Sequence, residues 1–213
     1  MIGVPERSAE RDSAIRAMLP HVPFDGWTMR ALRAGLVDLG QPPELAPNLF
    51  PDGSVGLVEA WSDLVDREME AAAEGIAGRG LGRRVRAVLA LRLGQLRPHR
   101  EAVGRALAVL ARTAEAGAAA RITARTVDAI WHAAGDRTAH FSWYTKRASL
   151  AAIYSATLLY WLNDQSDGDE ATLAFLDRRL AGVAAFGAAR RRLAARVRCP
   201  WLGKAAEPPP DAA

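Results

Sequence analysis

Cysteine and histidine are scarce in this sequence of 213 residues. The single cysteine, Cys199, excludes an internal disulfide and a cysteine-cluster metal site, and it fits a reducing compartment. The four histidines form no HExxH motif, and none lies near Cys199 in the sequence to act as its base. We therefore predict a protein that is not an enzyme and that binds no metal or cofactor.

β-Branched residues are also sparse, whereas alanine and leucine dominate, so helix is favoured over strand. Half of the residues are hydrophobic and 24% are charged, which is the balance of a folded globular protein. The apolar spacing predicts about nine helices and no convincing strand, hence an all-α fold. The main helices are expected at Ser8–Leu19, Thr28–Leu39, Ser54–Ile76, Arg83–Leu96, Arg100–Arg112, Thr123–Ala134, Trp143–Leu162 and from Ala171 past Arg192.

One helical stretch carries no charge from Ala148 to Asn163. A membrane-spanning helix needs roughly 20 apolar residues. This run is shorter and contains Ser155 and Thr157, so we interpret it as a helix that is buried on most sides.

Acidic residues are absent from Arg178 to Lys204, where seven arginines and one lysine give a charge of +8. Within this stretch, residues 186–204 are predicted to form a basic amphipathic helix, a type that binds anionic membranes. The expected membrane contacts are Phe186, Arg190, Leu193, Val197 and Trp201. The alternative is a helix that packs against a second subunit. The proline-rich tail, residues 205–213, is predicted to be disordered.

Two stretches resemble a known family, the ubiquinone-biosynthesis accessory proteins that form the ninth group of coenzyme Q proteins. The first runs Leu-Pro-His-Val-Pro-Phe-Asp-Gly-Trp over residues 19–27. The second, more specific, runs Ala-Gly-Asp-Arg-Thr-Ala-His-Phe-Ser-Trp-Tyr-Thr-Lys-Arg over residues 134–147. The resemblance covers about residues 8–185. His140 and Ser142 depart from the aspartate and asparagine that the family often has there.

This resemblance implies a fold like that of TetR regulators, usually dimeric, with a hydrophobic pocket that binds lipid. It also implies a partner, the di-iron hydroxylase that modifies the quinone ring. The implied docking residues are Trp143, Tyr144, Lys146 and Arg147. From spacing alone, burial in the core is the favoured explanation of the two aromatic residues, and the resemblance reverses this preference.

The uncharged helix is expected to leave an apolar cavity where it faces two neighbouring helices, and this cavity suits an isoprenoid quinone or its precursor. The predicted lipid-binding residues are Val88, Leu91, Ile130, Trp131, Ile153, Tyr154, Leu158 and Trp161. A bulky residue at Ala152 or Ala156 is expected to fill the cavity.

Residues 1–52 are predicted to be a degenerate helix-turn-helix-like module, followed by a lipid-binding body at residues 53–185. Where a recognition helix would lie, residues 41–53 contain four prolines and two acids but no Lys, Arg, Ser or Thr. Only Gln41 and Asn48 have side chains suited to reading bases, whereas DNA binding needs cations at the phosphates. We therefore favour the accessory protein, without a nucleic-acid partner, over a TetR-type repressor that senses a small apolar ligand.

The N-terminus lacks the apolar core of a secretion signal. In a bacterium, we expect a cytoplasmic protein that is peripheral to the inner face of the cytoplasmic membrane. For eukaryotic relatives, the resemblance implies the matrix side of the mitochondrion.

Overall fold

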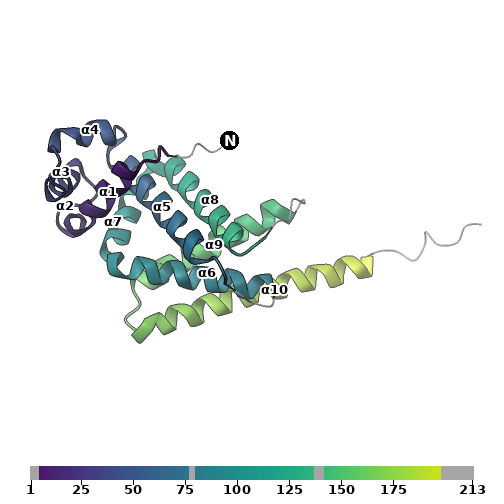
Figure 1. Cartoon of the computed structure of the whole chain (residues 1–213). Helices are drawn as coiled ribbons and strands as arrows, with labels where there is room; N and C mark the ends of the chain where they lie inside the picture. Colours follow the sequence, from purple (N-terminus) through teal and green to yellow (C-terminus); the bar gives the residue numbers. More distant parts are fainter. Residues whose placement is uncertain (1–4, 77–79, 137–141, 198–213) are drawn as a thin grey trace, which may run out of the picture.

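The computed structural model describes residues 5–76, 80–136 and 142–197, with residues 113, 142, 143 and 186–197 described by their backbone alone. Within these residues the chain is all-helical, with eight helices of ten or more residues and two of four residues. Figure 1 shows a small N-terminal module at one end, a larger helical body in the middle and a long last helix that extends past the body. The predicted all-α fold is thus confirmed.

The N-terminal module consists of α1 (Ala9–Met18), α2 (Val22–Asp25), α3 (Met29–Asp38) and α4 (Ala46–Leu49). Thr28 caps α3 as expected, since its side-chain oxygen accepts a hydrogen bond from the Ala31 amide at 3.3 Å. Helices α1 and α3 approach each other closely at Gly35. A Cβ atom added there would lie 2.6 Å from the backbone nitrogen of Met18. A side chain at position 35 therefore has no space.

The body consists of six longer helices: α5 (Gly53–Ala72), α6 (Leu81–Leu96), α7 (Arg100–Leu110), α8 (Ala116–Ala133), α9 (Ser142–Leu162) and α10 (Glu170–Val197). These bounds agree with the predicted ranges to within two residues, except that α5 ends at Ala72 rather than Ile76 and that α8 begins at Ala116 rather than Thr123. The added residues include four alanines, the best helix former, so the helix extends through them despite Gly117.

Two sets of contacts join the module to the body. Trp27 is buried, donates a hydrogen bond from its indole nitrogen to the Ala102 carbonyl at 2.9 Å, and packs against Trp61 with ring centroids 4.9 Å apart. Asp63 on α5 accepts hydrogen bonds from Arg7, and Arg67 on α5 donates hydrogen bonds to Asp12 on α1. These bonds hold α1 and the chain before it against α5.

The turn between α9 and α10 is held by two carboxylates. Asp164 accepts hydrogen bonds from Ser166 and from Thr172, which hold the pKa of its carboxyl well below its usual range. Burial alone would raise the pKa of Asp169, but hydrogen bonds from Arg97 and Arg100 outweigh burial and lower it. Both aspartates are therefore ionised at neutral pH and stabilise the turn.

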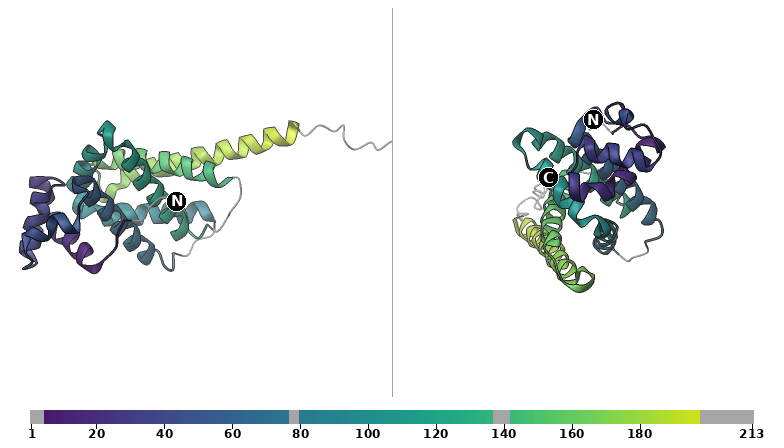
Figure 2. Two further views of the ribbon diagram at one scale, coloured as in Figure 1. Left: turned by 90° about the horizontal axis from the view of Figure 1, so that it is seen from above. Right: turned by 90° about the vertical axis from the view of Figure 1, so that its left-hand side faces the viewer.

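Helix α10 packs against α9 and α6 over its first part, where Arg86 forms an ion pair with Asp177 at 3.0 Å. From Ala181 to Ala185 every residue is exposed, including Val183 at 44%. Figure 1 and the left view of Figure 2 show that the rest of α10 extends beyond the other helices. The expectation that the last helix continues past Arg192 is confirmed, and no break in the helix separates residues 170–185 from 186–197.

Candidate functional site

An apolar cavity of about 330 Å³ lies between α5, α6, α7, α8 and α9. This volume is at the lower end of the range for small-molecule sites, which is roughly 300–1,000 Å³. Each of the five helices contributes side chains to its wall. The lining residues are Val58, Trp61, Ser62, Val65, Arg92, Leu96, Val103, Ala106, Leu107, Leu110, Ala111, Ala119, Ile122, Thr123, Thr126, Tyr154, Ser155, Leu158 and Leu159.

One part of the cavity wall is polar and buried. Arg92 on α6, whose exposed fraction is 3%, forms an ion pair with Asp66 on α5, with 2.5 Å between Nη1 and Oδ1. The Arg92 Nε donates a hydrogen bond to the Tyr154 hydroxyl at 2.9 Å, and Thr126 donates one to Asp66 at 3.0 Å. These groups bring charge and hydrogen-bonding capacity to an otherwise apolar cavity.

The two charges of this cluster stabilise each other. Burial raises the pKa of the Asp66 carboxyl, against the opposing effects of the Arg92 charge and the Thr126 hydrogen bond. Burial alone would lower the pKa of Arg92, but the charge of Asp66 and the hydrogen bond to Tyr154 raise it overall. Arg92 therefore stays cationic, and its pairing with Asp66 leaves the polar wall with little net charge.

The cavity opens to the surface between the end of α7, α8 and α9. Ala111, Ser155 and Leu159 belong to its lining and are exposed, with Leu159 exposed to 57%. Leu110 and Ala119 beside them are half-buried. The mouth is thus mainly apolar, whereas the polar groups lie on the buried wall.

Two of the eight predicted lipid-binding residues, Tyr154 and Leu158, line the cavity. The other six, Val88, Leu91, Ile130, Trp131, Ile153 and Trp161, pack in or against the core beside it. The sequence did not indicate the contributions of α5 and α7, because their apolar stripes have the same spacing whether they border a filled core or a hole.

The two alanines at which a bulky substitution was expected to fill the cavity do not line it. Ala152 is exposed on α9, and Ala156 is half-buried outside the lining. The expectation was wrong because α9 turns a different face to the cavity, the one that carries Tyr154 and Leu158. The alanines that do line it are Ala106, Ala111 and Ala119 on or next to α7 and α8.

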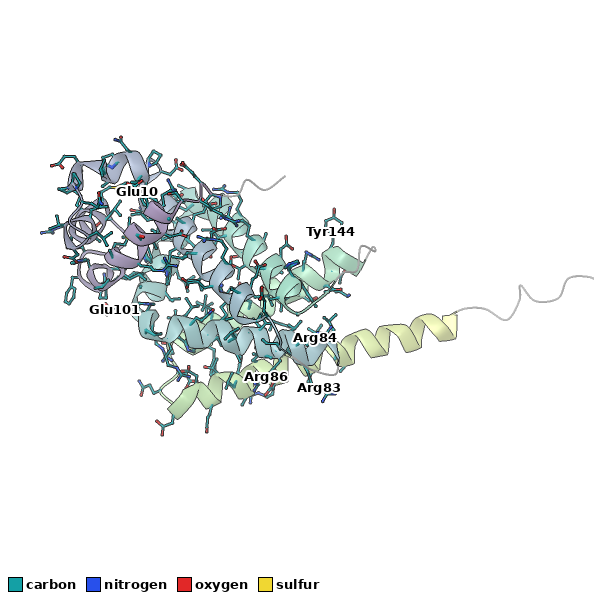
Figure 3. All side chains as sticks on the ribbon, in the orientation of Figure 1. Glu10, Arg83, Arg84, Arg86, Glu101 and Tyr144 are labelled. Atoms are coloured by element: carbon teal, nitrogen blue, oxygen red, sulfur yellow. The ribbon has the colours of Figure 1, made fainter. Side chains whose placement is uncertain are left out.

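The predicted docking residues lie at the start of α9. Tyr144 is exposed to 75% and points away from the body (Figure 3). The cations beside it have partners within the chain: Lys146 lies 3.4 Å from Asp136 and over the Trp131 ring, and Arg147 forms an ion pair with Asp128. The side chain of Trp143 lies outside the described residues.

Comparison with known proteins places these features in a family. A family model for COQ9 matches residues 116–187, which span α8, α9 and the first part of α10. A protein from Drosophila melanogaster, named ubiquinone biosynthesis protein COQ9, mitochondrial, is 32% identical over 179 residues. The alignment covers 81% of this chain and 54% of that protein. The chain belongs to the COQ9 family.

Further COQ9 relatives agree with this assignment. The human protein of the same name is 32% identical over 174 residues, which cover 78% of this chain and 55% of the human protein. The protein from Dictyostelium discoideum, named probable ubiquinone biosynthesis protein coq9, is 28% identical over 174 residues and is also covered to 55%. The chain thus spans about half the length of the curated relatives it matches.

The COQ9-family chain has a TetR-like fold. A crystal structure of a TetR transcriptional regulator from Nitrosomonas europaea superposes with a TM-score of 0.66 at 20% sequence identity. The superposition covers 83% of this chain and 99% of the regulator. At this identity, the similarity concerns the fold alone.

The segment in place of a recognition helix is short and contains no lysine or arginine. Over residues 41–53, a single 3-10 turn (Pro43–Leu45) leads into the four residues of α4. Gln41, Glu44 and Asn48 are exposed on it. No lysine or arginine occurs in the sequence between Arg33 and Arg67. This surface therefore presents no cations for phosphate contacts.

The predicted membrane contacts of this COQ9-family chain fall where the structure gives no side chains. Phe186, Arg190, Leu193 and Val197 lie on the part of α10 that is described by its backbone, and Trp201 lies outside the described residues. In the described part of the chain, no helix is long and apolar enough to cross a membrane, and no three His, Cys, Asp or Glu side chains are grouped as metal ligands.

Proposed function

We propose that this protein is a non-catalytic accessory protein of ubiquinone biosynthesis that binds an isoprenoid quinone precursor and presents it to a di-iron hydroxylase. The observation that carries the proposal is the apolar cavity of about 330 Å³ that opens to the surface between α7, α8 and α9. The names of the COQ9 relatives support the pathway. Among the described lining residues, none is a histidine, cysteine or carboxylate, which supports binding rather than catalysis.

The cavity suits an amphipathic ligand that is mostly hydrocarbon. Aliphatic side chains from all five helices make up most of the lining, and the mouth remains apolar at Leu159. A long isoprenoid chain exceeds a volume of this size, so its far end would leave through the mouth. The apolar mouth can cover the part of the chain that emerges from the cavity.

The partner surface is proposed at the start of α9. Large exposed aromatic side chains are common among residues that dominate interface energies. Tyr144 meets this description, while the ion pairs of Lys146 and Arg147 within the chain indicate that the aromatic side chain contributes more than these cations. The hydroxylase would therefore dock about three helical turns before Tyr154, on the helix that carries this part of the cavity wall.

Complementation tests the role of the cavity in this proposal. In a strain that lacks the protein, an Ala106→Phe variant, in which the new ring fills the cavity, should fail to restore ubiquinone and should accumulate the hydroxylase substrate. Ala152→Phe adds the same ring on the exposed side of α9 and should complement as the wild type does. Full complementation by a folded Ala106→Phe variant would refute the role of the cavity.

We further propose that the outer part of α10 binds an anionic membrane surface, which would bring the cavity close to a membrane-embedded lipid. The exposure of residues 181–185 and the continuation of the helix to Val197 support this role. Deleting residues from Arg190 onward should weaken binding to anionic liposomes, because each basic residue contributes about 1 kcal/mol near such a surface. Unchanged liposome binding, together with loss of dimers, would instead indicate a helix that pairs with a second subunit.

The repressor alternative shares the fold and a ligand cavity. Its DNA-binding function requires cations at the recognition segment, and residues 41–53 have none. The electrostatics of the module therefore favour the accessory protein.

A further inference from the structure

The hydrogen bonds on the polar wall of the cavity have a defined direction. A guanidinium has only donors, so in the bond between Arg92 and Tyr154 the tyrosine oxygen accepts. Thr126 uses its single hydroxyl proton to donate to Asp66, at 3.0 Å. Ser62, which lies 3.4 Å from Thr126, must then be the donor in that contact. The hydroxyl protons of Ser62 and Thr126 therefore each have an acceptor within the cluster.

The remaining proton is that of the Tyr154 hydroxyl. Among the residues that the structure describes, the hydroxyl has one hydrogen bond, the one that it accepts from Arg92. Tyr154 lines the cavity and its exposed fraction is 8%, so bulk water does not readily reach this group. A buried donor without an acceptor is costly, by about 1–3 kcal/mol. The Tyr154 hydroxyl is thus a buried donor that the cavity wall offers to an occupant of the cavity.

We infer that the Tyr154 hydroxyl donates a hydrogen bond to a ring oxygen of a quinone-class ligand, which enters the cavity ring first. This inference rests on the proposed function, whose ligand it specifies. The bond that Tyr154 accepts from the Arg92 cation polarises its O–H group and strengthens it as a donor. Because Asp66 already neutralises Arg92, the site suits a neutral carbonyl or methoxy oxygen better than an anion.

The position of this donor fixes the orientation of the ligand. The polar groups lie on the buried wall near α6, whereas the mouth is lined by apolar residues such as Leu110 and Leu159. A ring bound at Tyr154 therefore leaves its hydrocarbon chain directed toward the mouth. In this orientation the ring is shielded from solvent until the ligand leaves for the partner enzyme.

A double comparison of ligand and variant tests the inference. The two probes are geranyl-1,4-benzoquinone and geranylbenzene, which share the tail and differ in the ring oxygens. Their dissociation constants are measured by calorimetric titration with the wild type and with Tyr154→Phe, which keeps the aromatic ring and removes the donor. The ratio of the two constants within each protein cancels the effect of the variant on the apolar wall.

In Tyr154→Phe, the preference for the quinone should fall by about three- to tenfold, the usual effect of one neutral hydrogen bond. Affinity for geranylbenzene should stay within about twofold of that of the wild type. The matched control is Tyr160→Phe, which removes a hydroxyl outside the cavity lining on the same helix and should leave the ratio unchanged.

The outcomes separate this inference from the proposed function. An unchanged ratio in Tyr154→Phe, with both probes still bound, would overturn the role of Tyr154 and leave lipid binding intact. Failure of the wild type to bind either probe would overturn the proposed function itself. A comparable fall in the ratio for Tyr160→Phe would also count against the inference, since that hydroxyl does not face the cavity.

Discussion

The N-terminal module and the helical body are both built from amphipathic helices, but they differ in how completely these helices pack. In the module, α1 and α3 approach so closely at Gly35 that even a methyl group has no space. In the body, five helices of ordinary amphipathic composition leave about 330 Å³ unfilled. Complete packing stabilises a protein, and a void loses contact energy. Close packing is thus found in the module and unfilled volume in the body, where we propose that the ligand binds.

The largest effect on the free energy of unfolding should come from replacing a leucine by alanine in each region. Leu32→Ala in the module removes a fully buried side chain and should destabilise the protein by about 3–5 kcal/mol, because it creates a cavity. Leu107→Ala removes a half-buried side chain that already borders a void, so its cost should be about 1–2 kcal/mol. Urea unfolding of both variants measures the difference, and equal losses would contradict the contrast in packing.

A smaller effect should follow from adding one methyl group. Gly35→Ala should destabilise by about 2–3 kcal/mol, since the new Cβ would overlap the backbone of α1 at Met18. Gly94→Ala on α6, where nothing lies within 4 Å of the added Cβ, should stabilise by about 0.5–1 kcal/mol. Thermal melts of the two variants should therefore shift in opposite directions. A stabilising Gly35→Ala would show that α1 and α3 are not in close contact.

The α9–α10 turn tests whether the body is loosely packed throughout or only at its cavity. Asp169 has a backbone φ of +61°, which asparagine tolerates, so Asp169→Asn removes the charge without adding backbone strain. The loss of its bonds to Arg97 and Arg100 should cost about 1–3 kcal/mol at pH 7. A loss below a few tenths of a kcal/mol would mean that this turn is also loosely held.

The same variant has a predicted pH dependence. The folded-state pKa of Asp169 is lowered, so its contribution to stability is present above the unfolded value of about 3.9 and is lost as the pH falls below it. The stability of Asp169→Asn should therefore fall less steeply between about pH 4 and pH 2 than that of the wild type. Asp66, whose pKa is raised, acts in the opposite sense in both proteins and cancels in the comparison. Parallel curves would contradict the assignment.

The smallest effect is expected at the surface that would contact DNA in a repressor. Mobility-shift titration against random duplex at low salt should show no binding through the module, and Gln41→Ala with Asn48→Ala should change nothing. Tight, salt-dependent binding that these substitutions abolish would support the repressor instead.

The sequence predicted most of the fold, because helix ends depend on local signals such as Thr28 as N-cap and Gly40 after α3. It predicted less of the cavity. Of the proposed lipid contacts, only Tyr154 and Leu158 line it, since helical spacing indicates which face is apolar but not whether the facing side chains meet. Arg92 and Asp66 lie 26 positions apart in the sequence, on two different helices. No local sequence motif signals that they pair.

The most direct test of the account is mass spectrometry of lipids extracted from the purified protein and two matched variants. The wild type and Ala152→Phe should both carry an isoprenoid quinone or quinone precursor at similar occupancy. Ala106→Phe, folded but with its cavity filled, should carry at most about a tenth as much, the loss expected when roughly 1.4 kcal/mol of binding is removed. Equal isoprenoid content in all three proteins would contradict the claim that this cavity holds the ligand.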